Sequence, residues 1–497
     1  MIPYRTCIHL DRNSKQALYV QLSNQFVRLI KSRMLSPSAK LPSSRSLANM
    51  LGIHRKTVIA CYDELILQGW IESIPKKGTY VHKSIPLLQQ KVLSSDSQNS
   101  ESGEAGFSYL KNSIFHRPEL EKLAGYQYLN DGESDQRLTP LNDIAKEYRS
   151  LAKRKSSLAN LAYGATYGND ELRKVLVEYL NETRGLHVTK EQLMITRGTQ
   201  MGLYLASRLL LEPDSKVIVG ETNYVAADLT FSYAGANLLR VPVDRNGIDT
   251  DAVAVLCEKH TIKAVYVTSH HHHPTTVTLS AKRRMHLLNL ARTYRFAIIE
   301  DDYDYDFHYD HAPILPLASH DLNGNIIYVG SICKTVAPAY RIGYLVASKN
   351  FVDECAKLRR YVDRQGDSML EATFARFIKN GDLDRHIRKV LKIYADRRSL
   401  FCSLLKKNLG KAISFEIPKG GMAVWVVLHK NYSWKTIAET AKKNGLIIGE
   451  WERYDRAKIG HNGIRMGFAA YTNDEIYSVI DKLKLAFENS YPHYLKP

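Results

Sequence analysis

Six short apolar runs in the later part of the chain alternate with segments that have the periodicity of helices. The runs are Leu193–Thr196, Val217–Gly220, Ala264–Thr268, Ala297–Glu300, Ile326–Val329 and Tyr344–Ala347. Strands that alternate with helices pair as a largely parallel sheet, which helices cover on both faces. The pattern extends over residues 126–497, which also leaves room for a smaller C-terminal lobe. The sequence therefore predicts an α/β domain built on a large, mostly parallel sheet.

A different pattern occupies residues 1–83. Apolar residues recur every four positions in a first helix, and two shorter helices follow, one from Ser44 to Gly52 and one from His54. Two β-like runs, 70–74 and 79–81, then flank a basic tetrapeptide and predict a hairpin. Three helices followed by a hairpin are typical of a winged helix-turn-helix, which is an α+β unit.

Residues 84–125 differ from both neighbours. The stretch LLQQKVLSSDSQNSESGEAG is rich in Ser, Gln and Glu and has no aromatic residue, a composition typical of a flexible linker. We therefore expect a winged helix-turn-helix over residues 1–83, a linker over 84–125 and the α/β domain over 126–497.

Positive charge is concentrated near the N-terminus. The 497-residue chain has a formal net charge of +18, and residues 1–90 contain 13 Lys and Arg against 4 Asp and Glu. These residues thus supply half of the positive excess. A folded block of this kind is typical of nucleic-acid binding, although a merely soluble basic domain would carry the same charge.

Several features bear on the compartment. The chain has no run of about 18 apolar residues, and its first ten residues lack an apolar signal core. Its six cysteines are scattered and show neither a disulfide nor a zinc-binding spacing. We therefore expect a cytoplasmic protein with no membrane span.

The N-terminal unit carries polar side chains where a helix-turn-helix meets DNA. The first turn of the recognition helix reads His54-Arg55-Lys56-Thr57. Arg can pair with a guanine edge through two hydrogen bonds, whereas Lys and Thr suit phosphate contacts. Ser44 and Arg45 begin the preceding helix, and Lys76 and Lys77 form the tip of the hairpin. Any one of these could be a solvated surface residue, but together they predict a double-stranded DNA operator as partner.

The segment LPSSRSLANMLGIHRKTVIACYDELILQGWIESIPKKGTYV resembles the winged helix-turn-helix of GntR-type regulators. The resemblance covers about residues 8–83 and includes the LPSSR run and the Gly78-Thr79 wing. It implies that six residues lie at DNA-contacting positions of the family: Ser44, Arg45, His54, Arg55, Thr57 and Gly78. Members of the family often have Ser where this chain has His54.

Converging polar residues also follow the strands of the predicted α/β domain. Ligands of such sheets bind beyond the carboxyl ends of the strands. Gly198-Thr199-Gln200 opens a helix there and offers free N–H groups to a phosphate, a signal that is weak by itself. Ser331, Lys334 and Arg341 follow another strand, and Asp301 ends a third. A Schiff-base lysine, a phosphate clamp and a carboxylate for a ring nitrogen are what pyridoxal 5′-phosphate (PLP) requires.

The segment GSICKTVAPAYRIGYLVAS resembles the lysine-bearing segment of fold-type I PLP enzymes, the aspartate aminotransferase class. IIEDDYDYDF resembles their Asp/Tyr segment, and YGATYGNDELRKVLVEYL with ITRGTQMGL resembles their N-terminal active-site region. The resemblance covers about residues 130–497. With its N-terminal unit, the whole chain resembles MocR/GabR-type regulators, in which a GntR winged helix is fused to an aminotransferase-like domain.

This resemblance implies three catalytic residues. Lys334 would form the internal aldimine with PLP, and Asp301 would hold the pyridinium proton, so that the ring acts as an electron sink. Tyr224 would stack on the ring. Tyr303 would hydrogen-bond the phenolic oxygen of the cofactor.

The remaining implied roles concern phosphate and effector. Thr199, Gln200, Ser331 and Arg341 would bind the phosphate. Arg465 sits where the class places the arginine that pairs with a substrate carboxylate, although a structural ion pair would look the same. His271 matches a family histidine and is the second predicted effector-binding residue.

The segment TSHHHHPTT, residues 268–276, departs from the family pattern. His273 stands where true aminotransferases carry Asn, and Thr276 replaces a Gly. Neighbouring side chains in an extended segment alternate between faces, so the four histidines do not predict a metal site. These departures leave PLP binding expected and make full transamination doubtful.

The function expected from the sequence is that of a DNA-binding transcriptional regulator that senses a small amino compound, or PLP itself. In the resembling family the active site is assembled across a dimer. We therefore expect a homodimer with domain swapping, in which each winged helix packs against the partner. In such a regulator, transaminase activity would be weak or vestigial. Two alternatives remain: an active aminotransferase that carries a DNA-binding domain, and a scaffold that binds DNA without using PLP.

Overall fold

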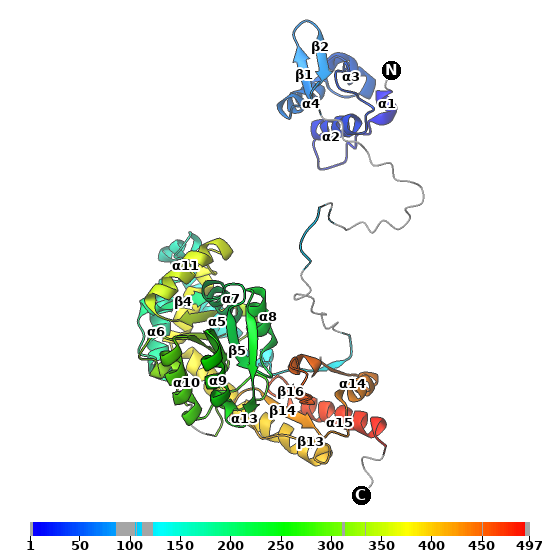
Figure 1. The fold of residues 1–497 in the computed structure, drawn as a ribbon. Helices are drawn as coiled ribbons and strands as arrows, with labels where there is room; N and C mark the ends of the chain where they lie inside the picture. Colours follow the sequence, from blue (N-terminus) through cyan, green and yellow to red (C-terminus); the bar gives the residue numbers. More distant parts are fainter. Residues whose placement is uncertain are drawn as a thin grey trace. The chain divides into compact units, whose positions relative to one another are not determined.

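The structure is a computed structural model that describes residues 3–85, 105, 107–111, 123–310, 314–332, 334–449 and 451–492. The chain divides into two compact units, Met1–Leu110 and Lys111–Pro497 (Figure 1). Most of the predicted linker lies outside the described residues. No helix in the described ranges has the length and apolarity needed to cross a membrane.

The first unit is a winged helix-turn-helix, which confirms the predicted fold class. Its elements are α1 (Tyr4–Cys7), α2 (Leu18–Lys31), α3 (Ser44–Leu51), α4 (Arg55–Leu67), β1 (Ile71–Ile74) and β2 (Gly78–Val81). The side chains of Leu22, Phe26, Leu47, Val58 and Leu65 are fully buried and form the centre of its core. The strands β1 and β2 pair antiparallel and form the wing.

Local signals fix the turn between α3 and α4. The Ser43 side chain accepts a hydrogen bond from the backbone N–H of Ser46 and thereby caps the start of α3. Gly52 ends α3 with φ of 63°, a left-handed conformation that a residue without Cβ adopts at no steric cost. His54 is the N-cap of α4, so the recognition helix itself begins one residue later than predicted, at Arg55.

The second unit contains a seven-stranded sheet in the order β4-β12-β11-β10-β9-β5-β6. Its strands are β4 (Leu193–Thr196), β5 (Lys216–Gly220), β6 (Asn237–Val241), β9 (Ile262–Val267), β10 (Ala297–Asp302), β11 (Ile326–Ser331) and β12 (Gly343–Val346). Five neighbouring strands are parallel, and β12 is antiparallel to both β11 and β4. The large, mostly parallel sheet is thus confirmed, and all six predicted runs belong to it.

The sequence did not reveal β6. This strand lies at one edge of the sheet, and Asn237 and Arg240 make it more polar than the six predicted runs. Two buried clusters cover the two faces of the sheet. One face packs against α7 (Thr199–Leu210), α8 (Val225–Tyr233) and α11 (Lys349–Val362), and the other against α6 (Asp170–Arg184), α9 (Thr250–Lys259), α10 (Ala281–Tyr294) and α12 (Ser368–Lys379) (Figure 1). A short hairpin, β7 (Val243–Asp244) and β8 (Gly247–Ile248), precedes α9.

The smaller C-terminal lobe has its own core. It contains α13 (Asp382–Leu409), β13 (Ile413–Ser414), β14 (Ala423–Leu428), α14 (Trp434–Lys443), β15 (Leu446–Ile448), β16 (Gly463–Gly467) and α15 (Asn473–Ser490). Strands β13, β14 and β16 form an antiparallel sheet. The early strand β3 (Gln127–Leu129) pairs in parallel with β15, and α5 (Leu141–Ala152) then leads back to the large sheet.

Candidate DNA-binding surface and cofactor site

The two helix starts of the helix-turn-helix lie side by side. Nε of Arg55 in α4 donates a 3.3 Å hydrogen bond to Oγ of Ser44 in α3. The side chains of Arg45, His54 and Lys56 are exposed around this contact, and that of Thr57 is partly exposed. The structure thus brings the predicted DNA-contacting residues of α3 and α4 onto one surface.

The cations of this surface are not neutralised within the described part of the chain. Arg45, Arg55, Lys56 and Lys77 make no ion pair with another described residue, although nineteen pairs of a lysine or arginine with a carboxylate occur among the described residues of the second unit. Uncompensated positive charge attracts the phosphate backbone and releases counterions when DNA binds. This observation favours a nucleic-acid interface over a solvated surface, on which lysines and arginines often pair with carboxylates.

The wing carries one cation that the sequence analysis missed. Gly78 has φ of 118°, and a Cβ at this position would lie 3.2 Å from Cε of Lys40. Nζ of Lys40 lies 5.9 Å from the centroid of the Tyr80 ring, and residue 40 forms an isolated β-bridge with Tyr80. Lys40 therefore adds positive charge to the wing beside Gly78 and Tyr80, a position that sequence periodicity does not indicate because residue 40 lies in a loop.

The predicted lysine lies over an aromatic ring in the second unit. Nζ of Lys334 is 4.0 Å from the centroid of the Tyr303 ring. Burial lowers the pKa of Lys334, because a desolvated ammonium is costly, and the carboxylates of Asp304, Asp131 and Asp301 oppose this shift. A lysine with a lowered pKa more readily becomes the neutral amine that attacks an aldehyde.

Asp301 is a buried carboxylate with one free oxygen. Its Oδ2 accepts a 2.9 Å hydrogen bond from the hydroxyl of Tyr266, whereas Oδ1 has no hydrogen-bond partner among the described residues. Burial raises the pKa of Asp301 to about 7, and the Tyr266 hydrogen bond and Lys334 act against this shift. A protonated ring nitrogen would supply the missing donor, so this side chain fits the predicted pyridinium partner.

A glycine shapes the predicted phosphate end. Gly198 has φ of 73° and precedes α7, and a Cβ there would lie 2.8 Å from Nη2 of Arg341. Arg341 donates from Nη2 to the carbonyl oxygen of Arg197 (2.8 Å). The backbone therefore comes close to the guanidinium at the N-terminus of a helix, where N–H groups and the helix dipole favour an anion. This cradle fits a phosphate group.

The other predicted phosphate ligands lie around this turn with additional contacts. Thr199 and Gln200 form the first turn of α7, where backbone N–H groups are available. Nε2 of Gln200 donates to the hydroxyl of Thr230 (2.6 Å), and the Ser331 hydroxyl donates to the Ile342 carbonyl oxygen (3.3 Å). The side chain of Gln200 is thus already engaged, and its backbone is the part placed to meet a phosphate.

Arg465 reaches the same site from strand β16. Its guanidinium donates to the carbonyl oxygens of Asp131 (2.7 Å) and Pro274 (3.2 Å) and to the Tyr303 hydroxyl (3.3 Å). The residue is 2% exposed and makes no ion pair with a described carboxylate. This geometry favours a carboxylate-binding arginine over the structural ion pair that was the alternative.

Tyr224 and His273 complete the wall beside Tyr303. The rings of Tyr224 and His273 lie 5.1 Å apart, and those of His273 and Tyr303 lie 6.2 Å apart. Burial and the positive charges of Arg465 and Lys334 hold the pKa of His273 well below its usual range, so its imidazole is neutral. Nδ1 of His273 has no hydrogen-bond partner among the described residues.

His271, the second predicted effector-binding residue, contacts an aspartate and another histidine. Its Nδ1 contacts Oδ1 of Asp304 (2.9 Å), and its ring packs on that of His308, with centroids 5.2 Å apart. Its carbonyl oxygen accepts the hydrogen bond of the Tyr303 hydroxyl (2.8 Å). The structure therefore links His271 to the site through its backbone and through Asp304, a residue that the sequence analysis did not single out.

The other two histidines of the run have separate partners. His270 contacts Asp302 (3.2 Å), and Nδ1 of His272 contacts the Thr275 hydroxyl (2.8 Å). Among the described residues, no group of three or more His, Cys, Asp or Glu side chains has an arrangement that could hold a metal ion.

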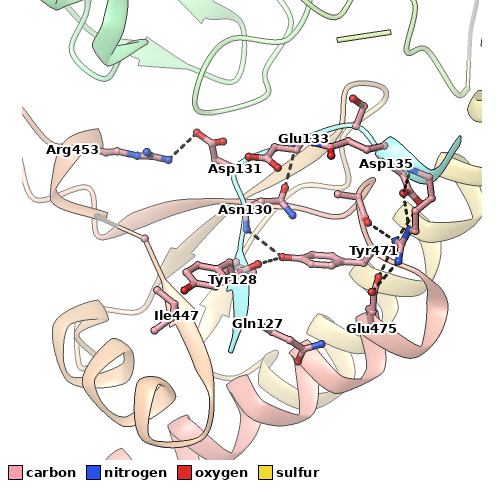
Figure 2. Close-up of a pocket in the computed structure, with 16 residues that line it drawn as sticks. Gln127, Tyr128, Asn130, Asp131, Glu133, Asp135, Ile447, Arg453, Tyr471 and Glu475 are labelled. Carbon is pink, nitrogen blue, oxygen red and sulfur yellow. Dashed lines mark hydrogen bonds and ion pairs between the residues drawn. The ribbon is translucent and has the colours of Figure 1, made fainter. Parts of the chain in front are cut away.

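A cavity of about 680 Å³ lies between the segment that follows β3 and the C-terminal lobe. Figure 2 shows Arg453 beside Asp131 at one end of it and Glu475 near Asp135 at the other. Arg453 forms a 2.7 Å ion pair with Asp131, whose carbonyl oxygen contacts Arg465. Asp131 and Arg453 are therefore neighbours of the predicted effector site that the sequence analysis missed, since they belong to no motif.

Comparison with known proteins agrees with both parts of this picture. Residues 119–483 match the family of class I and II aminotransferases, and residues 18–81 match the gntR family of bacterial regulatory proteins. The chain is 27% identical over 474 residues to YdfD of Bacillus subtilis, an uncharacterized HTH-type transcriptional regulator, covering 93% of this chain and 95% of that protein. It is 24% identical to MocR of Rhizobium meliloti, a probable rhizopine catabolism regulatory protein, covering 96% of this chain and 95% of that one.

A solved structure extends the comparison of the second unit. The multiple substrate aminotransferase of Thermococcus profundus superposes with a TM-score of 0.70 at 25% identity, covering 75% of this chain and 93% of that one. The expected combination of a GntR winged helix and a fold-type I aminotransferase-like domain is confirmed.

The buried carboxylate of Asp301 leads to a prediction about stability in the cofactor-free protein. Its pKa is raised from 3.8 to about 7, so the folded state holds this proton more tightly than the unfolded state. The contribution to stability is full below pH 4 and is lost as the pH rises through 7. Asp301→Asn keeps a neutral side chain, and we expect it to raise the free energy of unfolding by up to about 4 kcal/mol at pH 8, with a smaller gain at pH 5.

Urea unfolding of the cofactor-free protein between pH 5 and pH 8, followed by circular dichroism, measures this difference. Asp481→Asn alters an exposed carboxylate of α15 and is the matched control, for which no pH-dependent gain is expected. An equal effect of Asp301→Asn at both pH values would contradict the prediction.

Proposed function

We propose that the chain, which belongs to the class I and II aminotransferase family and carries a GntR-type DNA-binding domain, is a transcriptional regulator. In this proposal it binds PLP at Lys334 and senses a small amino compound. The observation that carries the proposal is the presence in one chain of an unneutralised helix-turn-helix surface and a buried Lys334–Tyr303–Asp301 site. Since the matching family is one of bacterial regulatory proteins, the site of action that we propose is the cytoplasm.

The residues around Lys334 would hold PLP at three points. PLP supplies an aldehyde carbon and an electron-withdrawing pyridine ring. The amine of Lys334 would bind at the aldehyde, and Oδ1 of Asp301, which has no partner among the described residues, would accept the proton of the ring nitrogen. The α7 N-terminus and Arg341 would hold the phosphate beside Gly198.

The effector site would lie between Arg465, Tyr224 and His273. A carboxylate would pair with the Arg465 guanidinium, which makes no ion pair with a described residue. The amino group would then face Lys334. By linkage, such a compound changes the affinity for DNA only to the extent that it binds the two states of the protein differently.

An aminotransferase with a DNA-binding domain is the second candidate. The similarity to a multiple substrate aminotransferase and the presence of Lys334, Asp301 and Tyr224 favour it. Against it stands His273, a neutral imidazole at a position where true aminotransferases carry an amide. The regulator therefore remains the first proposal, with transaminase activity weak or vestigial.

An exposed apolar surface of the second unit supports a homodimer. Leu158 and Leu161 of the 3-10 helix Lys155–Leu161 are 65% and 73% exposed, and Tyr163 and Tyr361 are 81% and 87% exposed. The guanidinium of Arg364 lies 4.2 Å from the ring of Tyr163, which joins this segment to the end of α11. Exposed apolar side chains on neighbouring segments are typical of a protein–protein interface, and a second copy of this chain is the partner we propose for them. Domain swapping of the winged helices stays a prediction from the family resemblance.

The first experiment concerns the cofactor. We expect the purified protein to develop a visible absorbance band with PLP. Borohydride should abolish this band and leave the cofactor permanently attached, because Lys334 would hold the aldehyde as an imine that hydride reduces to a stable amine. Lys334→Ala should lose this band, whereas Lys349→Ala, which alters an exposed lysine of α11, should keep it. Titration of a panel of amines and amino acids should then shift the band with one compound and weaken or strengthen DNA binding in parallel.

Three outcomes of this experiment distinguish the candidates. A stable spectral shift without keto product supports the regulator. Conversion of the cofactor to its amine form, reversed by a keto acid, would make the protein an aminotransferase first. A response of DNA binding that is unchanged in Lys334→Ala would contradict the sensor and leave a DNA-binding scaffold.

The second prediction concerns the recognition helix. Selection from a random duplex library should give the full-length protein a defined consensus, and affinity for it should fall linearly on a log–log plot as salt rises. Arg55→Ala should make one base position degenerate at a cost of about 1–3 kcal/mol. Lys77→Ala should weaken binding to all sequences and reduce the salt slope by about one.

Arg28→Ala is the control for this series, since Arg28 is an exposed cation on α2, outside both α3 and α4. We expect it to leave the consensus unchanged. Binding without salt dependence, or with the same consensus for Arg55→Ala, would contradict the proposed interface.

The third prediction concerns assembly. Sedimentation velocity should show the protein as a dimer, and Leu161→Glu with Tyr361→Glu should shift it toward monomer, because two desolvated carboxylates would oppose the interface. Leu322→Glu is the control, because Leu322 is 94% exposed but lies outside this patch. A dimer that persists in the double variant and dissociates with Leu322→Glu would place the interface elsewhere.

A further inference from the structure

The two residues that follow Lys334 are held by side chains from three separate segments of the second unit. The carbonyl oxygen of Thr335 accepts a hydrogen bond from Nε2 of His386 in α13 (2.9 Å). The Thr139 hydroxyl donates to the carbonyl oxygen of Val336 (3.1 Å). The hydroxyl of Thr335 itself donates to Oδ2 of Asp306 (3.0 Å). The residue that follows the lysine is therefore fixed through both its backbone and its side chain.

A buried ion pair in turn fixes Asp306. Nη2 of Arg184 lies 2.7 Å from Oδ1 of Asp306, and the Arg184 side chain is only 4% exposed. The guanidinium lies 4.3 Å from the centroid of the Tyr305 ring and 5.1 Å from that of Tyr179. Movement of Asp306 would leave a desolvated arginine without its counter-ion, which is costly. The acceptor of the Thr335 hydroxyl is thus held in place by charge and by packing.

The same short segment also supplies the surface on which the lysine rests. Tyr303 precedes Asp306 by three residues, and its ring lies beneath Nζ of Lys334. One short segment therefore contacts the lysine amine through Tyr303 and holds the residue after the lysine through Asp306. The amine of Lys334 and the backbone next to it are therefore positioned by the same part of the fold, residues 303–306.

We propose that Thr335 is a positioning residue, whose hydroxyl, anchored by the Arg184–Asp306 pair, directs the amine of Lys334 toward the aldehyde of PLP. This inference rests on the proposed function, since it assumes that Lys334 binds the cofactor. An amine reacts with an aldehyde only when the two groups are held close and well aligned. Loosening the peptide next to the lysine should therefore reduce covalent binding of PLP even in a well-folded protein.

Thr335→Val and Thr335→Ser separate this role from packing. Valine has nearly the shape of threonine and lacks the hydroxyl, whereas serine retains the hydroxyl and lacks the methyl group. We expect Thr335→Val to raise the dissociation constant for PLP about tenfold, which is the order expected for the loss of a hydrogen bond to a charged group. Thr335→Ser should stay within about twofold of the unaltered protein.

The readouts are an absorbance titration of the full-length protein with PLP and the pH midpoint of the bound cofactor's visible band. The midpoint should move by about half a unit or more in Thr335→Val, because the surroundings of Nζ change, and should stay in place in Thr335→Ser. Thermal unfolding and DNA affinity monitor the fold. If Thr335→Val does not fold, Thr335→Ala removes the same hydroxyl without a bulky replacement.

The outcomes separate the two proposals. If the unaltered protein shows no PLP band, the proposed function fails, and this inference fails with it. If it binds PLP and Thr335→Val matches it in affinity and midpoint, only the positioning role is overturned. Equal losses in Thr335→Val and Thr335→Ser would also overturn it, because the hydroxyl would then not be the determinant.

Discussion

Parallel strands end at one edge of a sheet, and the arrangement of the second unit depends on this constraint. Strand β10 delivers Asp301 and Tyr303 to that edge, and β11 leads to Lys334. Strand β12 is inserted antiparallel between β11 and β4, so the connection that carries Arg341 lies beside the turn after β4. The absence of a side chain at Gly198 is what allows this close approach. An amine, a carboxylate and an anion cradle are thereby brought together although more than a hundred residues separate Gly198 from Lys334.

Desolvation then sets the chemistry of these groups. Burial raises the pKa of Asp301 to about 7 and lowers the pKa of Lys334, so both charged forms are disfavoured in the cofactor-free protein. The neutral His273 imidazole follows from the same cause, with Arg465 and Lys334 adding to it. A site of this kind costs stability that a bound ligand can restore by mass action. If the protein binds PLP as proposed, cofactor binding and folding of this domain are coupled through the same few side chains.

The sequence was sufficient for the fold because the central strands are almost wholly apolar and the family motifs follow them directly. It missed β6, where Asn237 and Arg240 dilute the apolar pattern of an edge strand. For the candidate site, motif spacing indicated Lys334 and Asp301, whose surroundings fit the predicted roles. It could not show that the His271 ring turns toward Asp304, since ring orientation depends on packing against His308. The sequence also could not predict the contacts of Asp131 and Lys40 or the Arg184–Asp306–Thr335 chain of interactions. These are tertiary contacts between distant residues, and no local pattern indicates them.

Arg465 suggests how ligand binding could be transmitted within the second unit. It belongs to β16 of the C-terminal lobe, yet its guanidinium contacts Pro274, in the loop after β9, and Tyr303, at the end of β10. A carboxylate that binds this guanidinium competes with those contacts, so it alters the attachment of the lobe to the sheet. A ligand with an amine alone would reach Lys334 and leave the contacts of Arg465 intact. Because only differential binding shifts an equilibrium, the proposed sensing of an amino acid would depend on its carboxylate, which is the part of such a ligand that reaches Arg465.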